Sequence, residues 1–216
     1  MKVEIWSDVV CPWCYIAKRR FESALSHFAH AEEVAVEWRS FELDPNAPGG
    51  DDTESAVLLA RKYGFSVGEA RLRQARVTEI AAAEGLDYHL EATRRSNTFD
   101  AHRLLHLAKQ AGLQGALKER LMHAFFTDGE RVSDHDVLER LALEVGLEAG
   151  AVTTLLGGAF LAEEVRADER RARELGATGV PYFLVDDRYG VSGAQDPHRF
   201  SQLLDSAWLD ARSAAK

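Results

Sequence analysis

Hydrophobic positions in the first 44 residues predict a strand, a helix and a second strand. Residues 3–6 form a short β-branched and aromatic run that ends at two polar residues, which is typical of a buried strand leading into a loop. Behind Pro12, whose preset φ and missing N–H suit a first helical turn, apolar residues recur at helical spacing through residue 28. Residues 34–39 alternate apolar and polar positions before Pro45 and Pro48 end the pattern. We therefore expect a β-α-β unit that closes near residue 44.

The middle of the chain, from about residue 51 to residue 175, carries helical rather than strand patterns. Three apolar stripes with helical spacing occur around residues 101–108, 117–125 and 137–145. Ser133 or Asp134 is placed to cap the last of these helices. Glycines fall where helices would end, at positions 112, 129, 146 and 176. We expect a block of several helices here.

The last 40 or so residues return to strand patterns. Residues 182–185 and 189–192 are two strand-like runs separated by a short polar turn, which predicts a hairpin. Asp196 can cap a final helix in which Pro197 occupies the first position. The order predicts an α/β domain split between residues 1–44 and 176–216, with an all-helical subdomain of residues 51–175 inserted into it.

Composition and charge narrow the class of protein. The chain has 216 residues, is 46% hydrophobic and has a net charge of −9, which is a globular composition and argues against a nucleic-acid partner. Its basic clusters are short; residues 18–20, for example, are followed by Glu22, a pattern typical of a solvated helix face. The first residues include acids where a secretory signal needs an apolar run, and the longest uncharged stretch is broken by glycines. We expect a cytoplasmic protein without a membrane partner.

The two cysteines, Cys11 and Cys14, enclose Pro12 and Trp13 at the predicted junction of strand and helix. A helix N-terminus favours a thiolate, and such a setting can lower a cysteine pKa from about 8.5 to roughly 3.5–7.5. Cys11, at the very start, would gain most from this effect. Cys14, one turn further on, could attack a mixed disulfide formed on Cys11. The spacing therefore predicts a nucleophile and a resolving thiol.

Two other interpretations of the cysteine pair stay open. A C-x-x-C motif can supply half of a zinc site, and His102 and His106, spaced i and i+4, could supply the other half. The pair could also be two inert thiols in a core, although a proline in the first turn beside a tryptophan is an unusual setting for these. Neither alternative needs a redox reaction.

Three segments carry a family resemblance. Residues 7–15 around the cysteines, residues 178–181 (Thr-Gly-Val-Pro) and residues 191–195 (Val-Ser-Gly-Ala-Gln) together resemble the DsbA-like thioredoxin superfamily. The nearest branch is similar to the FrnE-like proteins, which are grouped with 2-hydroxychromene-2-carboxylate isomerases and kappa-class glutathione transferases; residues 97–102 also resemble this branch. The resemblance implies a thioredoxin fold with a large all-helical insertion.

The resemblance also implies roles for residues far from the cysteines. Pro181 would be a cis-proline opposite the cysteines, and Val180 would present backbone groups to an extended peptide or thiol substrate beside Cys11. Asn97 and His102 either line a substrate cleft or serve as helix caps and packing groups.

Asp8 has two candidate roles next to the motif. It either influences the proton of Cys14 or caps the helix that follows. Trp13 differs from the histidine that strongly oxidising family members carry between their cysteines, so it supplies no positive charge to a thiolate. If the Cys11–Cys14 pair has a reduction potential near −200 mV, in a cytosol near −280 mV, the difference favours the reduced dithiol form by roughly 3.7 kcal/mol. A protein held in this form would reduce or isomerise disulfides.

These observations predict a thiol-disulfide oxidoreductase that acts on a disulfide-containing protein or a small thiol substrate. Glutathione is a candidate co-substrate, no tightly bound cofactor or metal is expected, and no oligomeric state is implied. An alternative is a glutathione-dependent isomerase or transferase acting on a small aromatic substrate, although those relatives carry serine at the position of Cys11. A binding module with idle cysteines is the third hypothesis.

Overall fold

The computed structural model describes residues 1–49 and 52–214, and the chain divides into two compact units. The sheet unit contains residues 1–43 and 167–216, and the helical unit contains residues 44–166. The predicted start of the helical subdomain at Asp51 lies outside the described residues.

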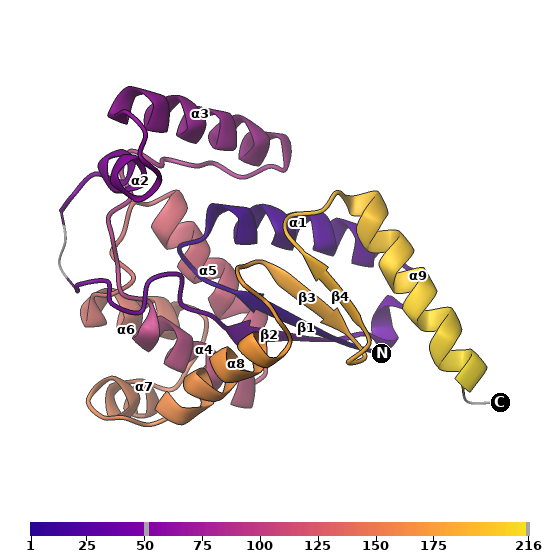
Figure 1. The fold of residues 1–216 in the computed structure, drawn as a ribbon. Coiled ribbons are helices and arrows are strands. Elements are labelled where there is room, and N and C mark those ends of the chain that lie inside the picture. Colours follow the sequence, from indigo (N-terminus) through magenta and orange to yellow (C-terminus); the bar gives the residue numbers. More distant parts are fainter. Residues whose placement is uncertain (50–51, 215–216) are drawn as a thin grey trace. The chain divides into compact units, whose positions relative to one another are not determined.

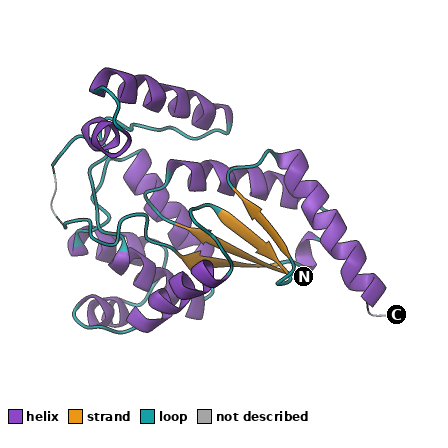
Figure 2. Ribbon diagram, in the orientation of Figure 1, coloured by secondary structure: helices purple, strands orange, loops and turns teal. Residues whose placement is uncertain are grey.

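Four strands form the sheet of the described residues: β1 (Lys2–Ser7), β2 (Ala35–Ser40), β3 (Tyr182–Val185) and β4 (Tyr189–Ser192). Their order is β2-β1-β3-β4, with β1 parallel to β2 and antiparallel to β3, and with β3 antiparallel to β4 (Figure 2). The central strand β1 thus joins the start of the chain to its end, because Ile5 lies opposite both Trp38 and Phe183. The predicted strands and hairpin are confirmed.

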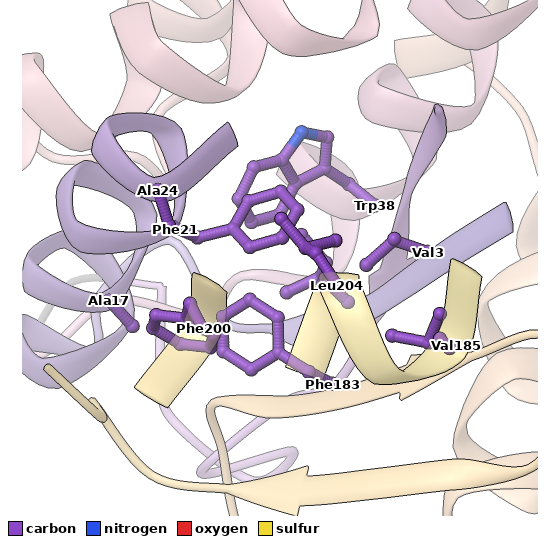
Figure 3. Packing of buried hydrophobic residues seen from close by; sticks show 11 residues of the cluster. Val3, Ala17, Phe21, Ala24, Trp38, Phe183, Val185, Phe200 and Leu204 are labelled. Atoms are coloured by element: carbon purple, nitrogen blue, oxygen red, sulfur yellow. The ribbon is translucent and has the colours of Figure 1, made fainter. Parts of the chain in front are cut away.

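One face of this sheet is covered by α1 (Pro12–Ser26) and α9 (Pro197–Ala214), which pack against each other (Figure 1). Asp196 accepts a hydrogen bond from the Arg199 amide at 2.9 Å, as expected of the cap of the last helix. Between the helices and the sheet lies an apolar core that joins both ends of the chain (Figure 3). Its buried residues come from β1, α1, β2, β3 and α9: Val3, Ile5, Ala17, Phe21, Ala24, Trp38, Phe183, Val185, Phe200, Leu204 and Ala207.

A second, smaller cluster lies on the other face of the sheet. It joins Trp6 and Leu184 of the strands to Ala172, which lies on α8 (Ala162–Glu174). The Trp6 indole N–H donates to the backbone carbonyl of Asp168 at 2.9 Å. These contacts place the second part of α8 in the sheet unit, whose second segment begins at Ala167. The sequence pattern instead predicts that the helical subdomain ends at residue 175.

The helical unit consists of helices joined by loops, of which the connection over residues 84–98 is the longest between described helices of this unit. The 3₁₀ turn η1 (Ala31–Glu33) belongs to the sheet unit. The glycines at positions 112, 129 and 146, predicted to end helices, have positive φ angles of 72°, 69° and 96°. Asp134 caps α6 by accepting a hydrogen bond from the Asp136 amide at 2.9 Å. The described helices wholly within this unit are α2 (Ser55–Tyr63), α3 (Val67–Ala83), α4 (Phe99–Gln110), α5 (Gln114–Phe126), α6 (His135–Glu144) and α7 (Ala149–Leu156).

No helix in the part of the chain that the structure describes combines the length and the apolar character that a transmembrane segment requires.

Candidate active site

The cysteine motif lies where β1 passes into α1. Cys11 is the N-cap residue of the helix, with extended backbone angles, and Pro12 occupies the first helical turn. The Cys14 amide donates to the Cys11 carbonyl at 3.0 Å, which closes the turn between the two cysteines. Both cysteines are free thiols and both are buried, with exposed fractions of 4% for Cys11 and 1% for Cys14, whereas Trp13 is 39% exposed.

The segment before β3 lies beside the first cysteine. The Cys11 thiol donates a hydrogen bond to the carbonyl oxygen of Val180 at 3.7 Å. The peptide bond between Val180 and Pro181 is cis, the geometry that the family resemblance implies. β1 and β3 are neighbouring antiparallel strands, so the end of β1 and the start of β3 meet at the same edge of the sheet. This pairing brings together two motifs that lie far apart in the sequence.

Asp8 connects the segments that follow the two parallel strands. Its side chain is buried, and its Oδ2 atom accepts a hydrogen bond from the Leu43 amide at 2.8 Å. Leu43 follows β2, and Asp8 directly follows β1. The carboxylate therefore ties the segment that leads into the cysteine motif to the segment after β2, and it places a negative charge near the Cys11 thiol.

The pKa of the Cys11 thiol is raised well above its ordinary value, opposite to the effect expected from the helix N-terminus. The largest cause is the hydrogen bond with the Cys14 side chain, followed by burial and by charge repulsion from Cys14 and Asp8. The sequence-based expectation of a low pKa at Cys11 is wrong, because the hydrogen bond with the Cys14 side chain and burial raise it.

Asn97 and His102, the other candidate site residues, belong to the helical unit. The Asn97 amide donates to the carbonyls of Pro45 at 3.4 Å and Ala47 at 3.3 Å. Its Oδ1 atom accepts from the Phe99 amide at 3.0 Å, so Asn97 also helps to begin α4. His102, on α4, is buried with an exposed fraction of 1%. A role toward substrate stays a prediction for both residues.

A zinc site at the motif would need Cys11, Cys14 and two histidines to converge on one metal ion. Among residues 1–49 and 52–214, no group of three or more histidine, cysteine, aspartate or glutamate side chains is arranged to hold a metal ion.

The basic residues that follow the cysteines differ from the expectation of a solvated face. Lys18 is 4% exposed and pairs with Glu22 at 2.6 Å. Arg20 is half-buried, and its Nη1 atom donates to the Ala194 carbonyl at 2.8 Å. The prediction is wrong for Lys18, because helical spacing alone does not show which side chains a neighbouring segment covers.

Sequence reasoning also missed a buried ionic network on the face of the sheet opposite α1. Arg39 Nε donates to Glu4 Oε1 at 2.8 Å, and Arg39 Nη1 donates to Asp168 Oδ1 at 3.0 Å. Arg171 contacts the other Glu4 oxygen at 3.1 Å. A glutamate inside the apolar run of β1 was the one signal in the sequence that such a network exists.

The sheet order, the paired cysteines at the start of α1 and the neighbouring Val180–Pro181 segment define a thioredoxin-like protein. The chain belongs to the DSBA-like thioredoxin domain family, which it matches over residues 2–205. This confirms the predicted α/β thioredoxin fold with its helical insertion, and it places the protein among the DsbA-like oxidoreductases.

Individual relatives agree with this family. The chain is 48% identical to a protein named probable DsbA oxidoreductase from Streptomyces coelicolor, with a TM-score of 0.92 over 96% of this chain and 90% of the other. It is 27% identical to the uncharacterized protein YwbO of Bacillus subtilis (strain 168) over 94% of each chain. Its fold is shared with the cytosolic disulfide reductase DsbM from Pseudomonas aeruginosa, at 20% identity and a TM-score of 0.63 over 95% and 98% of the chains. DsbM was also solved with GSH.

Proposed function

We propose that this protein is a cytoplasmic thiol-disulfide oxidoreductase in which Cys11 is the nucleophile and Cys14 the resolving thiol. The observation that carries the proposal is the position of the Cys11 thiol, at the N-cap of a helix and 3.7 Å from the Val180 carbonyl, with Cys14 in the first turn of that helix. Val180 and Pro181 lie at the start of a strand, where backbone groups can align an extended substrate. Pro12 and Trp13 shape the rim of the same site.

The chemistry follows two exchange steps. The Cys11 thiolate attacks one sulfur of a substrate disulfide, forming a Cys11–substrate disulfide and releasing the other substrate sulfur as a thiol after it takes up a proton. The Cys14 thiolate then attacks the Cys11 sulfur, which releases the second substrate thiol and leaves a Cys11–Cys14 disulfide. The substrate gains two electrons, and two molecules of a thiol such as glutathione return them to the protein as they become a disulfide.

The raised pKa of Cys11 affects the first step. Most of the resting protein holds the Cys11 proton, so attack requires that this proton leave before or during the reaction. The Cys14 side chain and burial mainly hold this proton on Cys11, and we propose that the charge of the buried Asp8 carboxylate adds to their effect. Disulfide reduction or isomerisation in the cytoplasm agrees with the name of DsbM, a cytosolic disulfide reductase.

Glutathione is the proposed co-substrate, a choice supported by the structure of DsbM with GSH. Disulfide-bonded proteins or small disulfides are the proposed substrates. Asn97 and His102 are retained as candidate substrate contacts of the helical unit, and the division into a split thioredoxin domain and a helical insertion is retained as the domain proposal.

The test is turnover of a disulfide substrate in a glutathione-coupled assay by the wild type, Cys11→Ser and Cys14→Ser. Since the chain has only two cysteines, each variant leaves one defined thiol. We expect Cys11→Ser to be inactive and to form no mixed disulfide. Cys14→Ser should retain the attacking thiol and accumulate a mixed disulfide with substrate, visible by mass spectrometry.

Two outcomes would contradict the proposal. If Cys14→Ser does not form the adduct and Cys11→Ser does, the two roles are reversed. If the wild type binds glutathione but reduces no disulfide, the isomerase or transferase hypothesis replaces the redox one. Titration of the Cys11–Cys14 couple in glutathione buffers then determines whether an active protein reduces or oxidises its substrates in the cell.

A further inference from the structure

Arg20 reaches from the helix that carries the cysteines to a loop near the other end of the chain. It lies on α1, is half-buried, and donates through Nη1 to the Ala194 carbonyl at 2.8 Å. Ala194 follows β4, so this contact joins residues 174 positions apart. A hydrogen bond from a charged donor to a backbone carbonyl is stronger than one between neutral groups. The contact therefore anchors the loop after β4 to α1.

The same loop holds the segment that faces the Cys11 thiol. The Gly193 amide donates to the Pro181 carbonyl at 2.8 Å. Gly193 has a φ of +85°, a conformation that glycine adopts with little strain. The Gln195 amide returns to the Gly193 carbonyl at 2.9 Å, which keeps the turn compact.

These contacts form a closed ring of hydrogen bonds that begins and ends on one helix. It runs from the Cys11 thiol to Val180, through the Pro181 carbonyl to Gly193, and from Ala194 back to Arg20. We propose that Arg20 is a positioning residue, which sets the distance between the Val180 carbonyl and the Cys11 thiol. The inference rests on the proposed function of Cys11, but the effect of Arg20 on the Cys11 thiol can be measured without turnover.

This ring of contacts predicts in which direction the alkylation profile of Cys11 shifts when Arg20 is replaced. A carbonyl that accepts a hydrogen bond from a thiol stabilises the protonated form, and it would repel a thiolate. If loss of Arg20 lets Val180 move away, the Cys11 thiol ionises more easily and its alkylation profile moves to lower pH. The charge of Arg20 by itself has the opposite effect, because removing a cation disfavours a nearby thiolate and moves the profile to higher pH.

The experiment uses Cys14→Ser as the background, so that Cys11 is the one thiol in the chain. Its alkylation by iodoacetamide is measured against pH with and without Arg20→Met. Arg19→Met is the matched control, since it removes the same charge from the adjacent position, where the side chain contacts Glu22 and Tyr15 on its own helix.

We expect Arg20→Met to raise the alkylation rate at neutral pH by roughly two- to tenfold, the range that one hydrogen bond accounts for. Arg20→Lys, which keeps a donor, should recover part of the wild-type profile. Arg19→Met should leave the profile unchanged or move it to higher pH. In the protein with both cysteines, Arg20→Met should raise KM for disulfide substrate more than it lowers kcat, because Val180 is part of the proposed substrate edge.

A second variant keeps the inference independent of Arg20 alone. Gly193→Ala strains the same loop through its positive φ, although a methyl group there would meet no atom closer than 3.8 Å. It should move the alkylation profile in the same direction, and Arg20→Met combined with Gly193→Ala should move it little further, because both changes release the same segment.

Several results would overturn the inference. These are an unchanged profile in Arg20→Met, a shift to higher pH, or an equal shift in Arg19→Met. Urea unfolding of each variant identifies a shift caused by general loss of structure, which would likewise refute a positioning role. If wild-type turnover is absent while the alkylation shift is present, the proposed function fails and the positioning role stands.

Discussion

Replacing Phe21 by alanine tests whether the core on one face of the sheet holds the cysteine-bearing helix in place. Phe21 lies on α1, is 1% exposed, and packs against Phe183 and Phe200 with ring centroids 5.5 and 5.6 Å away (Figure 3). Phenylalanine-to-alanine changes in cores cost about 3–5 kcal/mol. Because two aromatic pairs are lost as well, we expect about 4–5 kcal/mol, a large share of the roughly 5–15 kcal/mol that stabilises a typical protein.

The assay is urea unfolding followed by far-UV circular dichroism, with the unfolding free energy taken from the midpoint and slope. Phe160→Ala is the matched control, since Phe160 is 53% exposed and its loss should change the free energy by about 0.5 kcal/mol or less. Thiol labelling of Phe21→Ala should also be faster, because opening of α1 exposes both cysteines. A loss below about 2 kcal/mol at unchanged slope would refute this account of the core.

Four further predictions concern the charge of Asp8, the pH dependence of stability, a buried ion pair and backbone space. Asp8→Asn should move the alkylation profile of Cys11 to lower pH, since the Asp8 carboxylate adds to the raised thiol pKa that the Cys14 side chain and burial mainly produce; no shift would contradict this. Because the folded state holds the Cys11 proton more tightly than the unfolded chain, the unfolding free energy should fall as pH rises above about 8.5. Arg39→Met removes a cation from between two buried carboxylates and should cost about 3–5 kcal/mol in urea unfolding, with a loss under 1 kcal/mol as the contrary result. In Gly190→Ala the new methyl group would overlap the Tyr182 hydroxyl, costing about 1–3 kcal/mol, and Tyr182→Phe should restore part of that loss; no restoration would point to another cause.

Local features of the chain were predictable because their causes lie within a few residues. Pro12 begins α1, Asp134 and Asp196 cap later helices, and glycines with positive φ end three of the predicted ones. Each of these signals acts through its own backbone conformation or a hydrogen bond to a nearby amide. The strand positions followed for a similar reason, since short β-branched and aromatic runs, and in residues 34–39 a two-residue alternation, are local features of the sequence.

The candidate site was predictable in its chemistry but not in its electrostatics. The two cysteines at a strand-to-helix junction were evident from spacing, and their nearness to Pro181 was implied by the family resemblance. The raised pKa of Cys11 depends first on the hydrogen bond with the Cys14 side chain, then on burial, and least on the charge of Asp8, none of which the helix pattern reveals. Likewise, the burial of Lys18 depends on neighbouring segments.

The sequence by itself determined which residues form strands and helices, where the reactive thiols lie, and the family to which the chain belongs. Tertiary structure decided what surrounds those thiols, because β1 and β3 pair across most of the chain and bring Val180 to Cys11. It also decided that Arg20 contacts the loop after β4 and that Arg39 joins two buried carboxylates. Burial and long-range hydrogen bonds depend on the packing of distant segments. The periodic pattern of one segment does not show which other segment packs against it.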